Sequence, residues 1–442
     1  MPGEVFIMSK ILIIGGGWAG CSAALIAAKQ GAEVTLLEKT DLLLGAGNVG
    51  GIMRNNGRFT AAEENIALGA GELFEITDQY AVHKNVNFPG HDHASFYDAV
   101  KVEPAVRRLL EKQGIRVELR SRAVDVKWDY VDETGGEKRK HVEAVEVIRD
   151  GNPVWVEADG FVEATGSSGP MGNCMRYGNG CAMCIQRCPA FGPRVSLTAR
   201  AGAEDLSARR ESGRPGALSG SCKIEKKSLS KKLQKKLSRD GFAVLPLPPE
   251  LIHKGKLKEK VCQQYALDEF AENIILLDVG EAKLMTSYFN LEQLRTMEGL
   301  ERARFLDPYA GGQGNSVRYM SVGEREDTMR AAGFANLFLG GEKSGFFIGH
   351  TEAITTGSLA GYNAAREADG LTPRILPRTL AVGELLAYAQ EVLKEPDGVY
   401  HRFTFAGGEF FRRMQELGLY QVRPGEIHKN VEKAGLRNLY NH

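Results

Sequence analysis

Three glycines in a fixed spacing mark the stretch of this chain that could do chemistry. Gly15, Gly17 and Gly20 follow a short apolar run, 11–14, and precede an alanine-rich helical pattern over 21–29. In this context the first glycine allows a sharp turn off a strand, the second lets backbone approach a pyrophosphate, and the third lets the helix pack closely on the sheet. The unpaired N–H groups at the helix N-terminus favour the negative charge of the phosphates. The stretch predicts a dinucleotide-binding unit, and the alternative is a plain glycine-rich turn.

The residues after the next strand extend this prediction. A second apolar run, 33–37, ends at Glu38, near the spacing of about 20 residues at which a carboxylate binds ribose hydroxyls. The loop that follows has glycines at 45, 47, 50, 51 and 57 and is too rich in glycine for a helix or a strand. Such a loop lets backbone lie against a bulky flat ligand. The alternative is a flexible surface loop.

The pattern then changes to short strands. Runs at 123–130, 141–148 and 154–158 are joined by turn signals, and an apolar strand, 161–164, ends at Thr165-Gly166. This succession resembles the FAD-binding fold of flavoproteins with two dinucleotide-binding domains, in which a β-meander is followed by a strand ending in Ala-Thr-Gly. The resemblance implies FAD rather than NAD as the ligand.

The C-terminal part carries two further motifs. Residues 336–342 predict a strand that delivers Glu342 to a glycine turn, and 349–361 predict a helix with a small-residue face. By the same resemblance, such an acid binds the ribityl chain of FAD, and the helix N-terminus points at the isoalloxazine and stabilises negative charge there. On the motifs and the resemblance together, the residues assigned to the cofactor are Gly15, Gly17, Trp18, Ala19, Gly20, Glu38, Lys39, Asn48, Gly50, Gly51, Val124, Thr165, Gly166, Gly341, Glu342, Glu352 and Ala353.

The C-terminal run resembles more specifically the tRNA-modifying flavoproteins of the GidA and TrmFO type. In these a Gly-Tyr-x-Glu-Ala segment precedes Gly-x-x-Ala-Gly-x-Asn-Ala, and the run 349–365 is similar to it. The segment 48–52 is similar to their Asn-Pro-x-x-Gly-Gly-Ile loop, and 377–386 to their Thr-Ala-Leu-Gly-x-Leu segment. The likeness covers 10–120, 160–166 and 335–390, and the region 170–330 departs from it.

A cysteine cluster opens the departing region. Its members are Cys174, Cys181, Cys184 and Cys188. The Cys-x2-Cys-x3-Cys-Pro half matches the last three ligands of a bacterial ferredoxin run, in which thiolates hold iron and proline follows the final ligand. Cys174 could be the fourth ligand; Cys222 and Cys262 could each replace it, but both are expected to be unligated. The spacing predicts a 4Fe–4S cluster, while a structural zinc site and redox-active or nucleophilic thiols stay open.

The rest of this region gives weaker signals. The lysine-dense segment 223–260 could hold a phosphate backbone, but its helix-forming first half has no aromatic residue for base stacking, which favours a solvated face over RNA. Residues 307–325 are expected to line the substrate site. No side chain stands out by spacing as a general acid or base, so none is assigned as catalytic. The resemblance implies that His350 and Glu352 lie near the flavin face. A helix-capping or other structural role is expected for them at least as much as a catalytic one.

Composition sets the outer bounds. A chain of 442 residues is too long for one ordinary core, so two domains are expected. A zero formal net charge gives no general attraction to nucleic acid or membrane. No apolar run reaches the ~18 to 20 residues that span a bilayer, and the N-terminus lacks the features of a signal peptide. A cytoplasmic protein is expected.

We therefore predict an α/β protein with a two-dinucleotide-type (Rossmann-like) FAD-binding fold, a β-meander and an inserted α+β substrate domain. The FAD-binding domain is expected over 1–169 and 326–442, and the insertion over 170–325. The predicted function is that of an FAD-dependent oxidoreductase whose 4Fe–4S cluster exchanges electrons with the flavin. The alternatives are folate- and FAD-dependent methylation of a tRNA uridine and a flavoprotein with structural zinc. Expected partners are a small molecule or redox protein that donates or accepts electrons and further copies of this chain; tRNA is possible but not favoured, and no membrane is expected.

Overall fold

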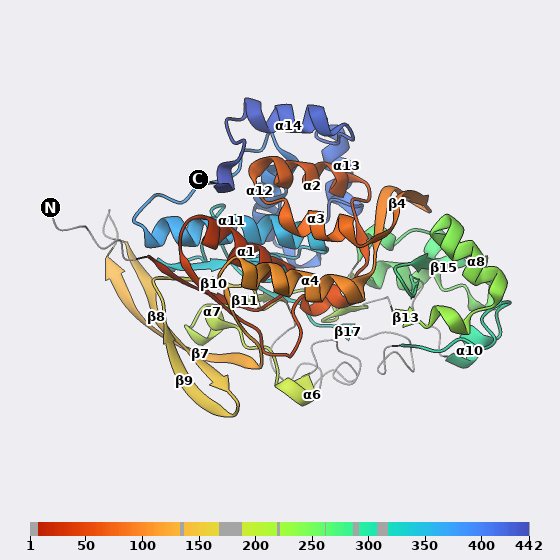
Figure 1. Ribbon diagram of the computed structural model, residues 1–442, viewed down its shortest axis with the longest axis horizontal. Helices are drawn as coiled ribbons and strands as arrows, with labels where there is room; N and C mark the ends of the chain where they lie inside the picture. The colour runs from red at the N-terminus through yellow and green to blue at the C-terminus, as the bar shows by residue number, and fades with distance from the viewer. Residues whose placement is uncertain are drawn as a thin grey trace.

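A parallel five-stranded sheet forms the centre of the protein in the computed structural model (Figure 1). The structure describes residues 8–132, 137–167, 188–218, 222–260, 262–285, 291–306 and 317–441. The strands in spatial order are β19 (Leu337–Leu339), β10 (Gly160–Glu163), β1 (Lys10–Ile14), β2 (Glu33–Leu37) and β6 (Arg116–Glu118). Because β10 and β19 come from distant parts of the chain, the sheet joins the N-terminal and C-terminal thirds.

Both faces of this sheet are buried, as its apolar strands require. Side chains alternate along a strand, so Ile11 and Ile13 enter the core beneath the helices, while Leu12 and Ile14 enter the core on the other face. The helical face is covered by α1 (Trp18–Lys29) and α11 (His350–Ala368). A three-stranded antiparallel sheet covers the other face, and it consists of β7 (Ser121–Asp132), β8 (Lys138–Arg149) and β9 (Asn152–Glu157).

Helices α1 and α11 approach each other closely because small residues line their contact. A Cβ added at Gly357 or Gly361 would collide with the backbone carbonyls of Ala19 and Ala23. The predicted small-residue face of α11 is therefore what lets the helix lie against α1. The predicted α/β fold, with its parallel sheet and β-meander, is confirmed.

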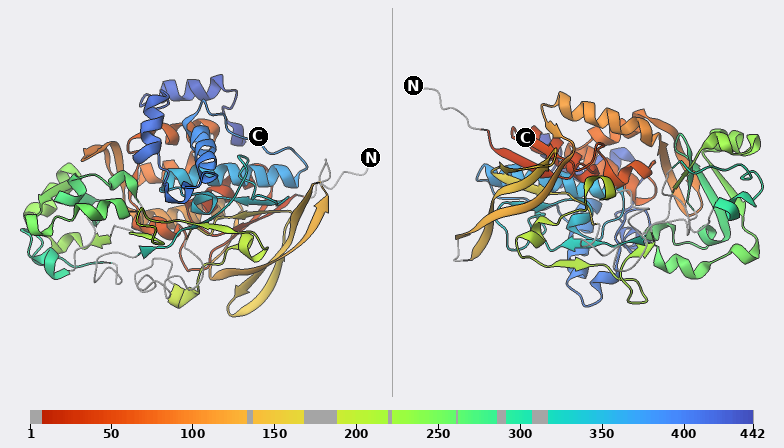
Figure 2. Two further views of the ribbon diagram at one scale, coloured as in Figure 1. Left: turned by 180° about the vertical axis from the view of Figure 1, so that it is seen from behind. Right: turned by 90° about the horizontal axis from the view of Figure 1, so that it is seen from below.

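A second sheet lies at the opposite end of the molecule from the β-meander, and all three views agree on this arrangement (Figures 1 and 2). Its strands in spatial order are β13 (Cys222–Ile224), β16 (Ala282–Leu284), β15 (Asn273–Asp278) and β14 (Phe242–Pro246). This inserted sheet has its own apolar core, which it shares with α8 (Lys231–Asp240). Antiparallel pairing of β12 (Ala217–Leu218) with β17 (Val317–Arg318) brings together the points where the chain leaves for the sheet and returns.

The other strands and helices of the described residues have the following bounds. The strands are β3 (Ile52–Met53), β4 (Ala81–Phe88), β5 (His91–Tyr97), β11 (Asp205–Ser207) and β18 (Ser321–Gly323). The helices are α2 (Gly57–Leu68), α3 (Glu72–Gln79), α4 (Ala99–Lys112), α6 (Cys188–Phe191), α7 (Leu197–Arg200), α9 (Glu269–Glu272), α10 (Leu291–Arg295), α12 (Ala381–Leu393), α13 (Gly408–Glu416) and α14 (Pro424–Lys433).

Parts of the expected insertion pack with both ends of the molecule. Leu197 and Ala201 around α7 lie in the core between the parallel sheet and the β-meander. In the other direction, Phe88 and Phe96 of the β4–β5 hairpin pack with residues of β15 in the inserted sheet. The domain boundaries at 170 and 325 stay a prediction. None of the helices in the described ranges is long and apolar enough to span a membrane.

Candidate functional site

The glycine turn lies at the carboxyl end of β1. Gly15 has a φ of +104°, and a Cβ there would collide with the Ala164 carbonyl, so the turn after β1 fits closely against the end of β10. A Cβ at Gly20 would collide with the Gly15 carbonyl, whereas the space beside Gly17 is open. No described side chain caps the N-terminus of α1. The turn therefore places a helix N-terminus without a side-chain cap next to open space at Gly17, which suits phosphate binding.

Glu38 stands beside this turn at the end of β2. The Gly16 N–H donates to Glu38 Oε2 (2.9 Å), and the Thr40 N–H donates to Oε1 (2.8 Å). Both bonds orient the buried carboxylate, and an ionised carboxylate can still accept further hydrogen bonds. The adjacent Lys39 Nζ donates to the Gly192 carbonyl (3.0 Å). Glu38 thus occupies the position predicted for a ribose-binding acid.

The ends of β10 and β19 bring Thr165 and Glu342 to the same edge of the sheet. The Ser167 hydroxyl donates to Glu342 Oε2 (2.7 Å), and Arg194 Nε donates to Thr165 Oγ1 (3.1 Å). The Gly341 N–H donates to the Thr356 hydroxyl of α11 (2.8 Å). The Ser167–Glu342 bond holds two loops that are 175 residues apart in sequence against each other. The Ala-Thr-Gly and Gly-Glu loops are therefore neighbours.

A cluster of buried charges lies beneath these loops, and sequence reasoning missed it. Lys343 Nζ donates to Asp205 Oδ1 (2.7 Å) and lies 4.0 Å from Glu163 Oε1, which also accepts from the Thr165 hydroxyl (2.9 Å). Burial acts to raise the pKa of Asp205, but the charges of Lys343 and Arg194 outweigh it and lower that pKa. The available signal was Glu163 itself, an acid at the end of an apolar strand.

The glycine-rich loop is held between α1 and the inserted sheet, because a Cβ at Gly47 would collide with Trp18. It contains one 3-10 turn (Gly45–Val49) and continues into the two-residue strand β3, so the expectation of no regular structure was too strict. Gly51 has a φ of +106°, and a Cβ there would collide with Val279 beside the inserted sheet. The Asn48 side chain donates to the Leu43 carbonyl (2.7 Å) and so fixes the turn from within.

Three aromatic side chains border this loop. The rings of Trp18 and His350 are stacked, with centroids 5.4 Å apart, and the Tyr97 hydroxyl lies 3.0 Å from His350 Nδ1. A Cβ at Gly50 would collide with the imidazole. Burial, with the nearby charges of Arg58 and Lys283, lowers the pKa of His350 to about 3, so its imidazole is neutral. Trp18 Nε1 is buried and has no hydrogen-bond partner among the described residues.

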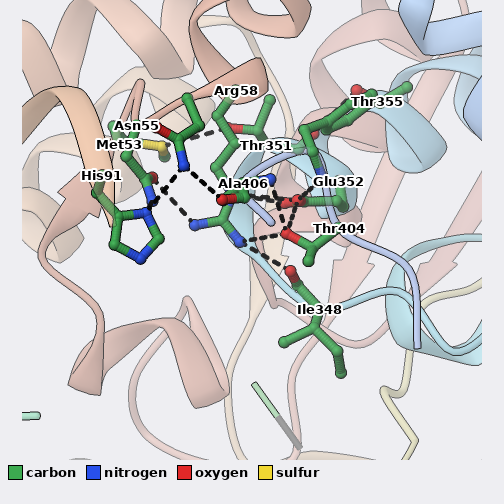
Figure 3. Close-up of polar contacts among 12 residues, drawn as sticks. Met53, Asn55, Arg58, His91, Ile348, Thr351, Glu352, Thr355, Thr404 and Ala406 are labelled. Carbon is green, nitrogen blue, oxygen red and sulfur yellow. Dashed lines mark hydrogen bonds and ion pairs between the residues drawn. The ribbon is translucent and has the colours of Figure 1, made fainter. Parts of the chain in front are cut away.

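A buried ion pair stands behind the first turn of α11 (Figure 3). Arg58 Nε lies 3.1 Å from both oxygens of Glu352, and the two side chains are 4% and 0% exposed. The carboxylate also accepts from the Thr404 hydroxyl (2.7 Å) and the Phe405 N–H (2.9 Å). Both oxygens of the Glu352 carboxylate thus accept from protein donors.

His91 extends this network in the neutral form. Burial and the charge of Arg58 lower the pKa of His91 to about 3. Its Nε2 lies 3.0 Å from the Gln264 carbonyl and must donate, so Nδ1 accepts from the Asn55 amide (3.0 Å). The network fixes the start of α2 relative to α11.

The structure brings most of the assigned residues to one edge of the parallel sheet. The glycine turn, Glu38, the loop 48–51, Thr165-Gly166 and Gly341-Glu342 all lie there, and Ala353 is in the first turn of α11. Val124 lies at a bulge in β7, between Ala123 and Asp125, where the pairing with β8 shifts by one residue.

The cysteine cluster falls largely outside the described residues. Cys174, Cys181 and Cys184 are not described, and the backbone of Cys188 begins α6. Within the described ranges, no group of three or more His, Cys, Asp or Glu side chains is arranged to hold a metal ion. Cys222 is buried in β13, and Cys262 is partly buried. The predicted cluster ligands thus stay a prediction.

Two kinds of comparison place the protein among known proteins. The sequence model of the GIDA family (Glucose inhibited division protein A) matches residues 10–241 and 268–372, which is most of the chain. The fold is similar to that of Aquifex aeolicus GidA in its form II crystal, with a TM-score of 0.61 at 17% identity over 98% of this chain and 77% of that one. The form I crystal gives a TM-score of 0.60 at 16% identity over 97% and 79%. These findings confirm the resemblance: the chain belongs to the GIDA family of flavoproteins.

Proposed function

We propose that this protein binds FAD without a covalent bond and acts as a flavin-dependent oxidoreductase. The observation that carries the proposal is the arrangement along one sheet edge of two sites that fit the two halves of a dinucleotide. At one, the turn after β1 and the fixed Glu38 carboxylate fit a pyrophosphate and a ribose. At the other, Glu342 and the N-terminus of α11 fit a ribityl chain and a flat ring system.

Each residue has a defined task in this proposal. The N–H groups at the start of α1 bind phosphate oxygens, and Glu38 accepts from ribose hydroxyls. Glu342, fixed by Ser167, accepts from the ribityl chain. The N-terminus of α11 stabilises negative charge, and the loop 48–51 excludes water from one side of the ring. Bound FAD would supply two-electron redox chemistry, which no side chain provides.

Cofactor analysis of the purified protein tests the proposal. We expect yellow protein that releases FAD on acid treatment, identified by chromatography and mass. Release of NAD, or the absence of any nucleotide after reconstitution with FAD, would overturn it.

Glu38 gives a residue-level test. Glu38→Ala should weaken FAD binding about 10- to 100-fold, because a hydrogen bond to a charged group contributes about 1.5 to 3 kcal/mol. The dissociation constant is measured by quenching of flavin fluorescence. Glu33→Ala, at the exposed start of the same strand, is the matched control and should bind FAD normally. Equal affinity in the two variants would remove Glu38 from the site.

We further propose that Cys174, Cys181, Cys184 and Cys188 hold a 4Fe–4S cluster that exchanges single electrons with the flavin. The ferredoxin-like spacing and the proline after Cys188 support this. The described residues on each side of the cysteines add support, because Ser167 bonds to Glu342 and Arg194 bonds to Thr165. Ser167, before the cysteines, and Arg194, after them, therefore both lie beside the proposed flavin site.

Metal analysis of anaerobically purified protein tests the cluster. We expect about four iron and four sulfide per chain, both lost in Cys184→Ser. One zinc without sulfide would make the site structural. Iron retained in Cys174→Ser would move the fourth ligand to another residue.

Methylation of a tRNA uridine with folate and FAD is the second candidate function, and membership of the GIDA family favours it. Incubation of the FAD-loaded protein with unmodified tRNA and methylenetetrahydrofolate, followed by nucleoside analysis, distinguishes it. Formation of 5-methyluridine would replace the oxidoreductase proposal.

We also propose that the protein forms a homo-oligomer and that a separate molecule donates or accepts its electrons. Light scattering at several protein concentrations tests the oligomeric state.

A further inference from the structure

Two lysines of the inserted sheet stand directly opposite each other. Lys223 of β13 and Lys283 of β16 are Cα partners in the antiparallel pair. Like charges in such a position destabilise a strand pair. Lys283 is only 6% exposed, and removing an ammonium from water is costly. The inserted sheet therefore places two positive charges side by side, although their mutual repulsion and the burial of Lys283 oppose folding.

Both ammonium groups reach across to the loop 48–51. Lys223 Nζ donates to the Asn48 carbonyl, and Lys283 Nζ donates to the Gly50 carbonyl, each at 2.7 Å. On the other side of the loop, the Tyr97 N–H donates to the Gly51 carbonyl (3.0 Å). Three carbonyl groups of this loop are thus anchored, two of them by lysines from the inserted sheet.

The charge of Lys283 also acts on the start of α11. Together with burial and Arg58, it lowers the pKa of His350, the first residue of that helix. The N-terminus of a helix carries a partial positive charge of its own. The lysine and the helix terminus therefore produce a positive potential in the same place, beside Gly50.

We propose that Lys283, with Lys223 beside it, is a positioning residue that fixes the loop 48–51 against the isoalloxazine and raises the reduction potential of bound FAD. The inference rests on the FAD binding proposed above. Two electrons and one proton add one net negative charge to the ring. A nearby ammonium stabilises that charge, so it favours the reduced form and any other form in which the ring is anionic.

The experiment separates the charge of Lys283 from its hydrogen bond. Lys283→Gln keeps an N–H donor for the Gly50 carbonyl but removes the charge, whereas Lys283→Arg keeps both. Lys223→Gln tests the neighbour, and Lys232→Gln removes an exposed lysine of α8 as the matched control. Each purified flavoprotein is titrated anaerobically with dithionite against a reference dye.

Sulfite serves as a second probe, independent of turnover. Its sulfur lone pair forms a bond to N5 of the oxidised ring with no leaving group, so negative charge passes onto the ring. We expect Lys283→Gln to raise the sulfite dissociation constant about tenfold and to lower the two-electron potential by about 30 mV, the equivalent of a tenfold change. Lys283→Arg should stay close to the unchanged protein in both measurements.

The outcomes distinguish this inference from the proposed function. If the unchanged protein retains no FAD, the proposed function fails and the inference fails with it. If FAD is retained and Lys283→Gln matches Lys232→Gln in potential and sulfite affinity, the inference alone is overturned. If Lys283→Gln does not fold, a lower potential in Lys223→Gln supports the inference, and an unchanged one overturns it.

Discussion

Arg58 and Glu352 show how much a single pair of side chains contributes to the geometry of the site. Burial acts to lower the pKa of Arg58, but the charge of Glu352 outweighs it and raises that pKa. The guanidinium also donates to the Ile348 carbonyl (2.8 Å), just before α11 begins. One ion pair therefore joins α2 to the backbone that leads into α11 (Figure 3).

Glu352→Gln should destabilise the protein strongly, because it leaves the buried Arg58 without its counter-charge. Breaking a buried pair in this way costs about 3 to 5 kcal/mol, and the urea midpoint should fall accordingly. The double variant Arg58→Met, Glu352→Gln should lose less than the sum of the two single variants. Glu298→Gln, at a carboxylate that is 88% exposed, is the control and should change the midpoint little. Additive losses would contradict the assigned coupling.

Helix α12 shows that the N-terminus of one helix can be capped by a side chain of another. Its N-cap position is Leu380, which provides no side-chain cap. Instead, the buried Glu64 of α2 accepts from the Ala381 N–H (3.0 Å) and the Val382 N–H (2.9 Å). Two N–H groups left unpaired by the helix itself are thereby satisfied. The start of α12 is therefore fixed by tertiary structure.

Stability should depend on pH through Glu64. Burial raises its pKa from 4.5 to about 7, against the opposing effect of the two N–H donors. Because the folded state binds the proton more tightly than the unfolded state, this contribution is complete below about pH 4.5 and is lost as pH rises through about 7. Between pH 5 and pH 8 the free energy of unfolding of the unchanged protein should fall by roughly 3 kcal/mol relative to that of Glu64→Gln. Thermal unfolding measures this difference, which should not change further above pH 8.

Glu111→Gln, which removes an exposed carboxylate of α4, is the control for that series. It should follow the unchanged protein at every pH. A constant difference between the unchanged protein and Glu64→Gln would show that the folded-state pKa is close to its ordinary value.

At the scale of the whole molecule, the chain enters and leaves the inserted sheet at two positions that lie side by side. Leu218 and Val317 are Cα partners in the β12–β17 pair, so the segment between them leaves and returns at neighbouring positions. The inserted sheet nevertheless packs against the β4–β5 hairpin and anchors the loop 48–51. The inserted sheet could therefore be removed without breaking the path of the remaining chain, but its side chains contact the rest of the molecule.

Replacing residues 219–316 with Asn-Gly should leave a folded parallel sheet, since Leu218 and Val317 can be joined by a two-residue hairpin turn. We expect near-normal far-ultraviolet circular dichroism for the remaining residues and a lower thermal midpoint, because Phe88 and Phe96 lose their cover. FAD binding should weaken, since Lys223 and Lys283 are removed. FAD affinity equal to that of the full chain would show that the inserted sheet does not contribute to FAD binding through the loop 48–51.

The sequence by itself determined the elements whose signals are local. The strands and turns that carry the glycine turn after β1, Glu38 after β2, and the Ala-Thr-Gly and Gly-Glu loops were predicted from local patterns, and the structure brings them to one sheet edge. Their signals are readable because strand period and turn chemistry act over a few residues. Membership of the GIDA family could likewise be anticipated from these motifs and the residues around them.

Only the tertiary structure decided how charged side chains are used. Glu352, expected at the cofactor, directs its carboxylate to Arg58, which lies 294 positions away in sequence. Lys283 reaches the Gly50 carbonyl across 233 positions, and Lys343 reaches Asp205 across 138. The physical reason is that burying a charge is favourable only beside a specific partner, and partners so far apart leave no mark on local spacing. The fold brings them together only after the apolar pattern has placed the strands and helices that carry them.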